Sequence, residues 1–408
     1  MDGKRILGFN RNVFFMGLTS LLTDVSSEMV FTIVPLFLAN VLGAATTIVG
    51  LVGGLSDSID AVFRIFSGWF SDRIGKRKLL AVTGYGFSTL SKPFMYIASI
   101  GWGVVLGVRI GDRIGKGIRS APRDALIADS VGANERGKSF GLHKAMDTSG
   151  AFIGLVIAAI IVYLVQGSDR LLELRTYQWL VIVGVIPAVL AVMVLLFFVH
   201  ERRVKHSVDG ATRPSFWSGF GGFSTRFKIF VAIMGIFTLG NSSDFFLILR
   251  AQNLEAPLIQ VVLMLVLFNA TYATISIPMG VLSDRLGRRR VLALGWFIYA
   301  LVYFGFALAT QMWQAWVLFA IYGLYYGVVE GVGKAFVADL VPKEKRGAAY
   351  GLYQGVISLA LLPASLIAGF LWDTINPAAA FYFGAGLAFL AMLGIMTLIK
   401  ERPVTSEP

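Results

Sequence analysis

The chain has 408 residues, of which 56% are hydrophobic and 15% are charged, and its mean hydropathy is +0.73. That much apolar surface excludes a soluble domain, a fibrous protein and a disordered chain. The formal net charge of +12 would suit nucleic-acid binding, but most Lys and Arg lie in short segments between apolar runs, which argues against that class. The absence of cysteine excludes disulfides and thiolate metal sites.

Apolar runs of about 20 residues recur along the chain, each long enough to cross a membrane as a helix. We expect twelve spans, near residues 12–41, 46–69, 78–99, 102–129, 139–165, 174–199, 229–250, 257–281, 290–310, 313–340, 347–371 and 378–400. The first is expected to be a retained helix rather than a cleaved signal peptide. A polar stretch, 200–228, is expected to be a linker between an N-terminal six-helix bundle (1–199) and a C-terminal one (229–408).

Lys and Arg alternate between the predicted loops. They are frequent at the N-terminus, in the loops after the second, eighth and tenth spans, in the linker and at the C-terminus, and sparse in the other loops. The positive-inside rule therefore predicts that both termini are cytoplasmic. We expect a multi-pass protein of a plasma membrane, the bacterial inner membrane in particular, in contact with membrane lipids.

An internal repeat relates the two predicted bundles. The segment GWFSDRIGKRK at 68–78 is echoed by GVLSDRLGRRR at 280–290. Asp129, Arg136, Gly137 and Gly141 recur with identical spacing as Asp339, Arg346, Gly347 and Gly351, and Ser-Ser-Glu at 26–28 recurs as Ser-Ser-Asp at 242–244. Two parallel repeats predict a substrate site near the middle of the membrane, between halves that rock in alternating access.

The two G-x-x-x-D-R-x-G-[KR]-[KR]-[KR] segments resemble the signature loop of the major facilitator superfamily, and the resemblance covers essentially the whole chain. It implies an all-α membrane protein with the major facilitator fold, in which twelve transmembrane helices form two pseudo-symmetric six-helix bundles, usually as a monomer. It also implies that each loop Asp faces a helix N-terminus of the other bundle, and that Lys76 and Arg288 pair with Asp129 and Asp339. The gating residues are then Gly68, Asp72, Arg73, Lys76, Asp129, Asp284, Arg288 and Asp339.

Charges inside predicted spans are costly and call for a reason. In the first span, Asp24 and Glu28 are four residues apart and share a helix face. Two carboxylates this close in a low dielectric tend to keep a proton, so the pair is a candidate proton carrier. The alternative is that both are structural partners of nearby cations.

The second and fourth spans carry further charges on single helix faces. Asp57, Asp60 and Arg64 share one face of the second span, where Asp60 and Arg64 can form a structural pair. The fourth span carries a charged stripe that includes Arg109, Asp112, Arg113, Lys116 and Arg123.

The stretch 113–121 resembles the superfamily motif R-x-x-x-G-x-x-x-A, whose Arg, here Arg113, is linked to proton coupling in antiporters. Lys116 and Arg119 replace the motif's usual Gln and second Gly, so the match is partial. Arg suits the bidentate recognition of carboxylate or phosphate, and Arg109 and Lys116 are the candidates for substrate contact. A self-neutralised network of these charges is the alternative.

The fifth span opens with His143, Lys144 and Asp147 and lacks the Gly-Pro signature of the superfamily's antiporters. In the second half the intramembrane charges are Asp244, a candidate proton site, and Glu330 and Lys334, which can pair within one helix. The candidate cavity residues are Asp57, Asp60, Arg109, Asp112, Lys116, Asp147, Glu330 and Lys334, and the candidate proton-coupling residues are Asp24, Glu28, Arg113 and Asp244.

These patterns predict secondary active transport of a small solute, favoured as proton-coupled export by antiport. One alternative is an organic-anion exchanger or uniporter that uses the cations of the fourth span. Another, from a different class, is a non-transporting receptor or scaffold. We expect no enzyme activity, cofactor or metal site: the P-loop-like GANERGKS at 132–139 joins two predicted membrane helices, and the three histidines have no zinc-like spacing.

Overall fold

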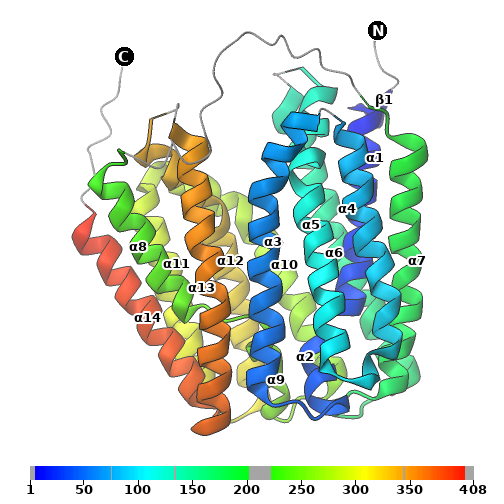
Figure 1. Cartoon of the computed structure of the whole chain (residues 1–408). Coiled ribbons are helices and arrows are strands. Elements are labelled where there is room, and N and C mark those ends of the chain that lie inside the picture. Colours follow the sequence, from blue (N-terminus) through cyan, green and yellow to red (C-terminus); the bar gives the residue numbers. More distant parts are fainter. Residues whose placement is uncertain (1–4, 75, 133–134, 202–221, 343–344, 400–408) are drawn as a thin grey trace.

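The computed structural model describes residues 5–74, 76–132, 135–201, 222–342 and 345–399. Most of these residues are helical, and the long helices run roughly side by side (Figure 1). Both ends of the described chain lie at the same end of the bundle, called here the terminal end, and the other is called the opposite end. The described strands are β1 (Arg5–Ile6) and β2 (Phe9–Asn10), an antiparallel hairpin that leads into the first helix.

The helices lie in two groups. The first group consists of α1 (Arg11–Phe31), α2 (Val34–Leu36), η1 (Phe37–Val41), α3 (Thr46–Ile74), α4 (Arg77–Ser91), η2 (Lys92–Ile100), α5 (Trp102–Ser130), α6 (Arg136–Val165) and α7 (Leu174–Phe198). The second consists of α8 (Thr225–Gly240), α9 (Phe245–Asn253), α10 (Leu258–Leu286), α11 (Arg288–Leu308), α12 (Met312–Leu340), α13 (Arg346–Thr374) and α14 (Pro377–Leu398). Each expected span corresponds to one of these helices or to a consecutive set of them.

Three expected spans are interrupted, for reasons the local sequence explains. The first breaks after α1 because Pro35 clashes with the carbonyl of the preceding turn and cannot donate to it. The third changes from α4 to η2 at Lys92, directly before Pro93. The seventh breaks at residues 241–244, where Asn, Ser and Asp side chains compete for backbone hydrogen bonds. Its second part, α9, begins directly after Asp244.

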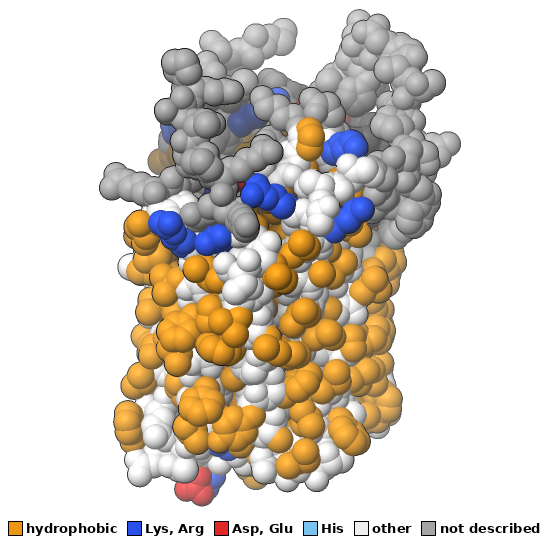
Figure 2. Space-filling model, turned by 90° about the vertical axis from the view of Figure 1, so that its left-hand side faces the viewer, with side chains coloured by type: hydrophobic (Ala, Val, Ile, Leu, Met, Phe, Trp, Pro, Cys, Tyr) orange, Lys and Arg blue, Asp and Glu red, His pale blue; other side chains and the backbone are white. Residues whose placement is uncertain are grey.

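Ten of the described helical segments are long and apolar enough to cross a membrane. The other two expected spans are the α4–η2 segment, which is interrupted, and α5, which runs 29 residues but carries many charges. Figure 2 shows hydrophobic side chains over the middle of one face, and Lys and Arg gathered toward the terminal end. This pattern fits a helical bundle with its middle in the hydrocarbon core.

The two groups contact each other mainly through two helix pairs, α3 with α13 and α6 with α10. Near the middle of the first pair, the Ser58 hydroxyl donates to the Ser358 carbonyl at 2.6 Å. Gly50 and Gly54 of α3 lie so close to α13 that a side chain on either would meet its backbone or Ser365. The contact therefore depends on small residues, as is common between membrane helices.

Candidate functional site

A cavity of about 1320 Å³ lies between the two groups of helices. Its wall comes from α1, α3, α5 and α6 on one side and from α10 and α12 on the other. It extends from Asp24 and Lys116, near the middle of their spans, to Asp124 and Gly141, nearer the terminal end. Among the described residues, its wall carries the cations Arg64, Lys116, Arg119, Arg123, Lys144 and Lys334 and the acids Asp24, Asp124 and Asp147.

The carboxyl groups of Asp24 on α1 and Asp147 on α6 lie within hydrogen-bonding reach of each other in this wall. The Ser20 hydroxyl donates to Asp147 Oδ1 at 2.7 Å, and Lys144 Nζ lies 3.8 Å from Oδ2. Two carboxyl groups can hydrogen bond only if one of them carries a proton. The carboxylate partner of Asp24 is thus Asp147, rather than Glu28 as the helical spacing indicated.

Glu28 lies deeper along α1, where the Thr32 hydroxyl donates to it, and it does not line the cavity. Lys92, which no sequence pattern singled out, is fully buried near this part of α1. Its ammonium donates to the hydroxyls of Ser26 and Ser27 at 2.8 and 3.0 Å, and it lies 5.7 Å from the Phe31 ring centroid. The only hint in the sequence is a Lys inside an apolar span.

Helix α5 places its charges at successive depths. Close packing fixes its orientation: a side chain at Gly115 would lie 2.8 Å from the Ser88 backbone nitrogen of α4. This packing directs Lys116, Arg119 and Arg123 to the cavity wall. Arg123 Nε pairs with Asp124 at 2.9 Å, whereas Arg119 lies over the Tyr85 ring at 4.3 Å from its centroid.

The other α5 charges differ from expectation, because each is held by a protein partner outside the cavity wall. Arg109, the expected substrate contact, is 3% exposed and lies between the rings of Phe31 and Phe245, with its guanidinium carbon 5.0 and 5.4 Å from their centroids. Asp112 accepts a hydrogen bond from the Ser88 hydroxyl.

Two carboxylates of α3 are paired with cations in the same way. Asp57 pairs with Arg113 at 3.2 Å, and Asp60 pairs with Arg64 at 2.9 Å. Asp57, Asp60 and Arg113 do not line the cavity, and Arg64 is the one member of these two pairs that does.

In the second group, Asp244 is held by aromatic hydroxyls of α12. Tyr322 donates to one carboxylate oxygen at 2.7 Å and Tyr326 to the other at 3.1 Å. Asp244 does not line the cavity in this structure, although it was expected as a proton site. Lys334 does line it, and the side chain of Glu330, its expected partner, lies outside the described residues.

Two ion pairs at the terminal end join helices within one group. Arg288 of α11 pairs with Asp339 of α12 at 2.9 Å, as expected. Asp129 of α5 pairs with Arg77, the neighbour of the expected Lys76. The side chains of Asp72, Arg73 and Asp284, with Gly68, lie outside the part described in such detail, as do residues 202–221 of the linker.

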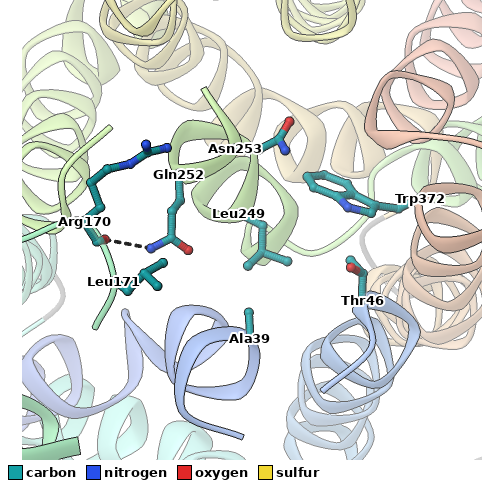
Figure 3. A pocket seen from close by; sticks show the side chains of 8 residues that line it. All are labelled: Ala39, Thr46, Arg170, Leu171, Leu249, Gln252, Asn253 and Trp372. Carbon is teal, nitrogen blue, oxygen red and sulfur yellow. Dashed lines mark hydrogen bonds between the residues drawn. The ribbon is translucent and has the colours of Figure 1, made fainter. Parts of the chain in front are cut away.

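The opposite end is closed by bonds between the groups. Asp373 at the end of α13 accepts from the backbone N–H of Thr46 and Thr47, at 3.0 and 2.7 Å, and from the Thr47 hydroxyl at 2.7 Å. Gln252 donates to the Arg170 carbonyl at 2.9 Å, beside a smaller cavity of about 490 Å³ (Figure 3). The larger cavity therefore reaches toward the terminal end from a closed opposite end.

Metal binding has no support in the described part of the chain, which contains no group of three or more His, Asp or Glu side chains that could hold an ion.

A bundle of membrane-length helices with a large cavity between two groups is the architecture expected of a membrane transporter. The sequence profile of the Major Facilitator Superfamily matches residues 16–252 and 229–408, and the chain belongs to this superfamily. It is thus a multi-pass transporter of a small molecule and not an enzyme.

An MFS-type transporter of Methanocaldococcus jannaschii is 36% identical over 390 residues, which is 94% of each chain. Multidrug resistance protein MdtH of Photorhabdus laumondii is 27% identical over 206 residues, 50% of this chain and 47% of its own. The crystal structure of a D-xylose-proton symporter matches with a TM-score of 0.76 and 17% identity, over 95% of this chain and 97% of that chain. At this identity the structural likeness shows the fold alone.

Proposed function

We propose that this transporter is a proton-coupled exporter and that Asp24 and Asp147 hold its coupling proton. The observation that carries the proposal is the carboxyl pair in the wall of the large cavity. A shared proton there is within reach of water from the terminal end, while the opposite end is closed. The same proton becomes accessible from the other side once the two groups rock.

The proposed cycle treats residues 1–199 and 229–408 as the two moving bodies. The Asp373 and Gln252 bonds break when the opposite end opens. Arg77–Asp129 and Arg288–Asp339 join helices within a body, so they need not break in that step. By the positive-inside rule the terminal end is cytoplasmic, in a bacterial-type plasma membrane, and the structure is inward-facing.

The partial similarity to MdtH supports export, and antiport with protons is the mode that the sequence favours. A carrier without proton coupling, such as an anion exchanger or uniporter, would not need the Asp24–Asp147 pair. A non-transporting receptor or scaffold would not need the cavity.

The test is proton flux in liposomes that contain the purified protein and a trapped pH-sensitive dye. The solutes are panels of organic anions, lipophilic cations and neutral sugars. We expect at least one solute to move protons, and the Asp24→Asn and Asp147→Asn variants to transport without proton movement or not at all. The matched control is Glu173→Gln, which removes an exposed carboxylate at the start of α7.

Solute movement without any proton movement in the unmodified protein would contradict the proposal. Proton movement that survives in both Asn variants would contradict the assignment of the pair. The direction of proton movement relative to the solute distinguishes antiport from cotransport.

A further inference from the structure

The cavity wall carries more positive than negative charge. Six cations and three acids line it among the described residues, and His143 is formally neutral. Three of the cations lie beside carboxylates: Arg64 pairs with Asp60, Arg123 with Asp124, and Lys144 Nζ lies 3.8 Å from Asp147. The remaining wall cations are Lys116 and Arg119, one turn apart on α5, and Lys334 on α12.

Within the part of the chain that the structure describes, no carboxylate lies within 4 Å of Lys116 or Arg119, although Asp24 and Asp60 lie near enough to interact with both electrostatically. Arg119 is 4% exposed, and its Nη1 has no hydrogen-bond partner. A buried guanidinium nitrogen without an acceptor is costly; Arg109 Nε and Arg113 Nε are in the same state, but neither of those residues lines the cavity. Because Arg119 does line the cavity, the acceptor that it lacks can come from a solute.

We propose that the transported solute is an organic anion, and that its carboxylate or phosphate group is bound by Lys116 and Arg119. A guanidinium and an ammonium one turn apart suit an oxyanion, which Arg can contact through two parallel N–H groups. The inference rests on the proposed transport function and names the substrate class of the same cavity. Arg109 and Arg113, the cations expected from the sequence, are held by Phe rings and by Asp57 instead.

The opposite wall supplies the rest of the site. Tyr272 and Asn269 of α10 and Lys334 of α12 line the same cavity, and Lys144 Nζ lies 5.8 Å from the Tyr272 ring centroid across the boundary between the groups. Cations on both walls repel each other when the cavity is empty. An anion bound between the two walls is attracted to the cations of both, and this attraction outweighs their repulsion. Its binding therefore favours closure of the two groups around it.

The proposal also sets the sign of proton coupling. When Asp24 and Asp147 lose their shared proton, the added negative charge competes with the solute for Lys116 and Lys144. Proton binding and anion binding therefore strengthen each other, and by linkage this effect is reciprocal. Solute and proton then cross in the same direction, so this inference replaces the antiport that the sequence favours with cotransport, and the direction of proton movement in the flux assay decides between them.

The experiment measures ligand binding by thermal stabilisation of the purified full-length protein, at constant ionic strength. The probes are pyrophosphate, succinate and benzenetricarboxylate as anions, tetraphenylphosphonium as a cation, and glucose as a neutral solute. We expect stabilisation by an anion, and roughly tenfold weaker binding in Lys116→Gln and Arg119→Gln, because each loses a charged hydrogen bond. The matched control, Arg175→Gln, removes an exposed cation at the start of α7 and should bind as the unmodified protein does.

Arg119 packs against Gly84 and Tyr85, so Arg119→Gln can lower stability by itself, and the less buried Lys116 then decides the outcome. No stabilisation by any anion, or equal stabilisation in Lys116→Gln and Arg175→Gln, overturns the inference. Proton flux separates it from the proposed function. If a cation or neutral solute moves protons, the anion site is wrong and proton coupling stands. If anions bind at Lys116 but no solute moves protons, the anion site stands and proton coupling is wrong.

Discussion

The two groups of helices are repeats, yet they use corresponding positions in different ways. Helices α5 and α12 have equal lengths, and residues 210 apart correspond along their whole course. Asp112 and Lys116 of α5 are replaced by Tyr322 and Tyr326 in α12. The first group thus carries ionic chemistry at positions where the second carries phenols.

The second group packs these phenols into a buried aromatic cluster. Tyr299, Tyr303 and Tyr322 are each about 1% exposed or less, and Tyr299 and Tyr303 stack with centroids 4.1 Å apart. Asp244 lies at the edge of this cluster and is held by two hydroxyls. In the proposed mechanism, one repeat supplies most of the charges that bind the solute and the proton, and the other supplies a wall and a framework.

The largest expected effect is at the carboxyl pair. Asp147→Asn keeps the shape of the side chain but cannot share a proton with Asp24. We expect proton-driven transport to fall by about 100-fold, the size that corresponds to losing a charged hydrogen-bonding group worth about 3 kcal/mol. Initial rates in liposomes under an imposed pH gradient measure this, with Glu173→Gln as control. A rate within a few-fold of the unmodified protein would remove Asp147 from the coupling site.

The sequence predicted the fold in detail because apolar length and loop charge determine membrane helices almost directly. The resemblance to the superfamily also implied the pair Arg288–Asp339, which the structure contains, whereas Asp129 pairs with Arg77 rather than with the expected Lys76. Asp24–Asp147 and the Lys92 site could not be predicted, because each depends on which face of one helix meets another. The position of Arg109 between Phe31 and Phe245 likewise requires contact between the two groups.

The next effect concerns stability in the first group. Asp57→Ala leaves Arg113 without its ion-pair partner at 3.2 Å. We expect the free energy of unfolding to fall by about 2 kcal/mol, less than for a fully buried pair because about a third of the Asp57 side chain is exposed. Thermal unfolding in detergent measures it. The double variant Asp57→Ala with Arg113→Leu should recover part of the loss, and a purely additive result would show that the pair is not coupled.

A smaller effect is expected in the second group. Tyr322→Phe removes one donor to Asp244, at 2.7 Å, and should cost about 1 kcal/mol of stability. Transport and its proton ratio should change little, because neither Tyr322 nor Asp244 lines the cavity. Thermal unfolding and flux on the same preparation test both statements. Loss of proton coupling with unchanged stability would place coupling in this group as well.

The smallest effect is at the opposite end. Asp373→Ala removes three exposed hydrogen bonds to Thr46 and Thr47, so that end should open more often. The chain has no cysteine, so Ala39→Cys in the smaller cavity gives a single reporter. We expect its labelling by a membrane-impermeant maleimide to rise by about two- to tenfold, as a loss of about 0.5–1.5 kcal/mol allows. Equal labelling with and without Asp373 would show that these bonds do not hold the end closed.

The most direct test of the division between the groups is proton uptake on solute binding, measured with a pH-sensitive dye in weakly buffered detergent solution. The anion is added at a pH high enough for the carboxyl pair to have lost its shared proton. The unmodified protein and Asp244→Asn should then each take up as much as one proton per bound anion, whereas Asp24→Asn and Asp147→Asn should take up none. The account would be contradicted if Asp244→Asn lost the uptake while the two first-group variants kept it.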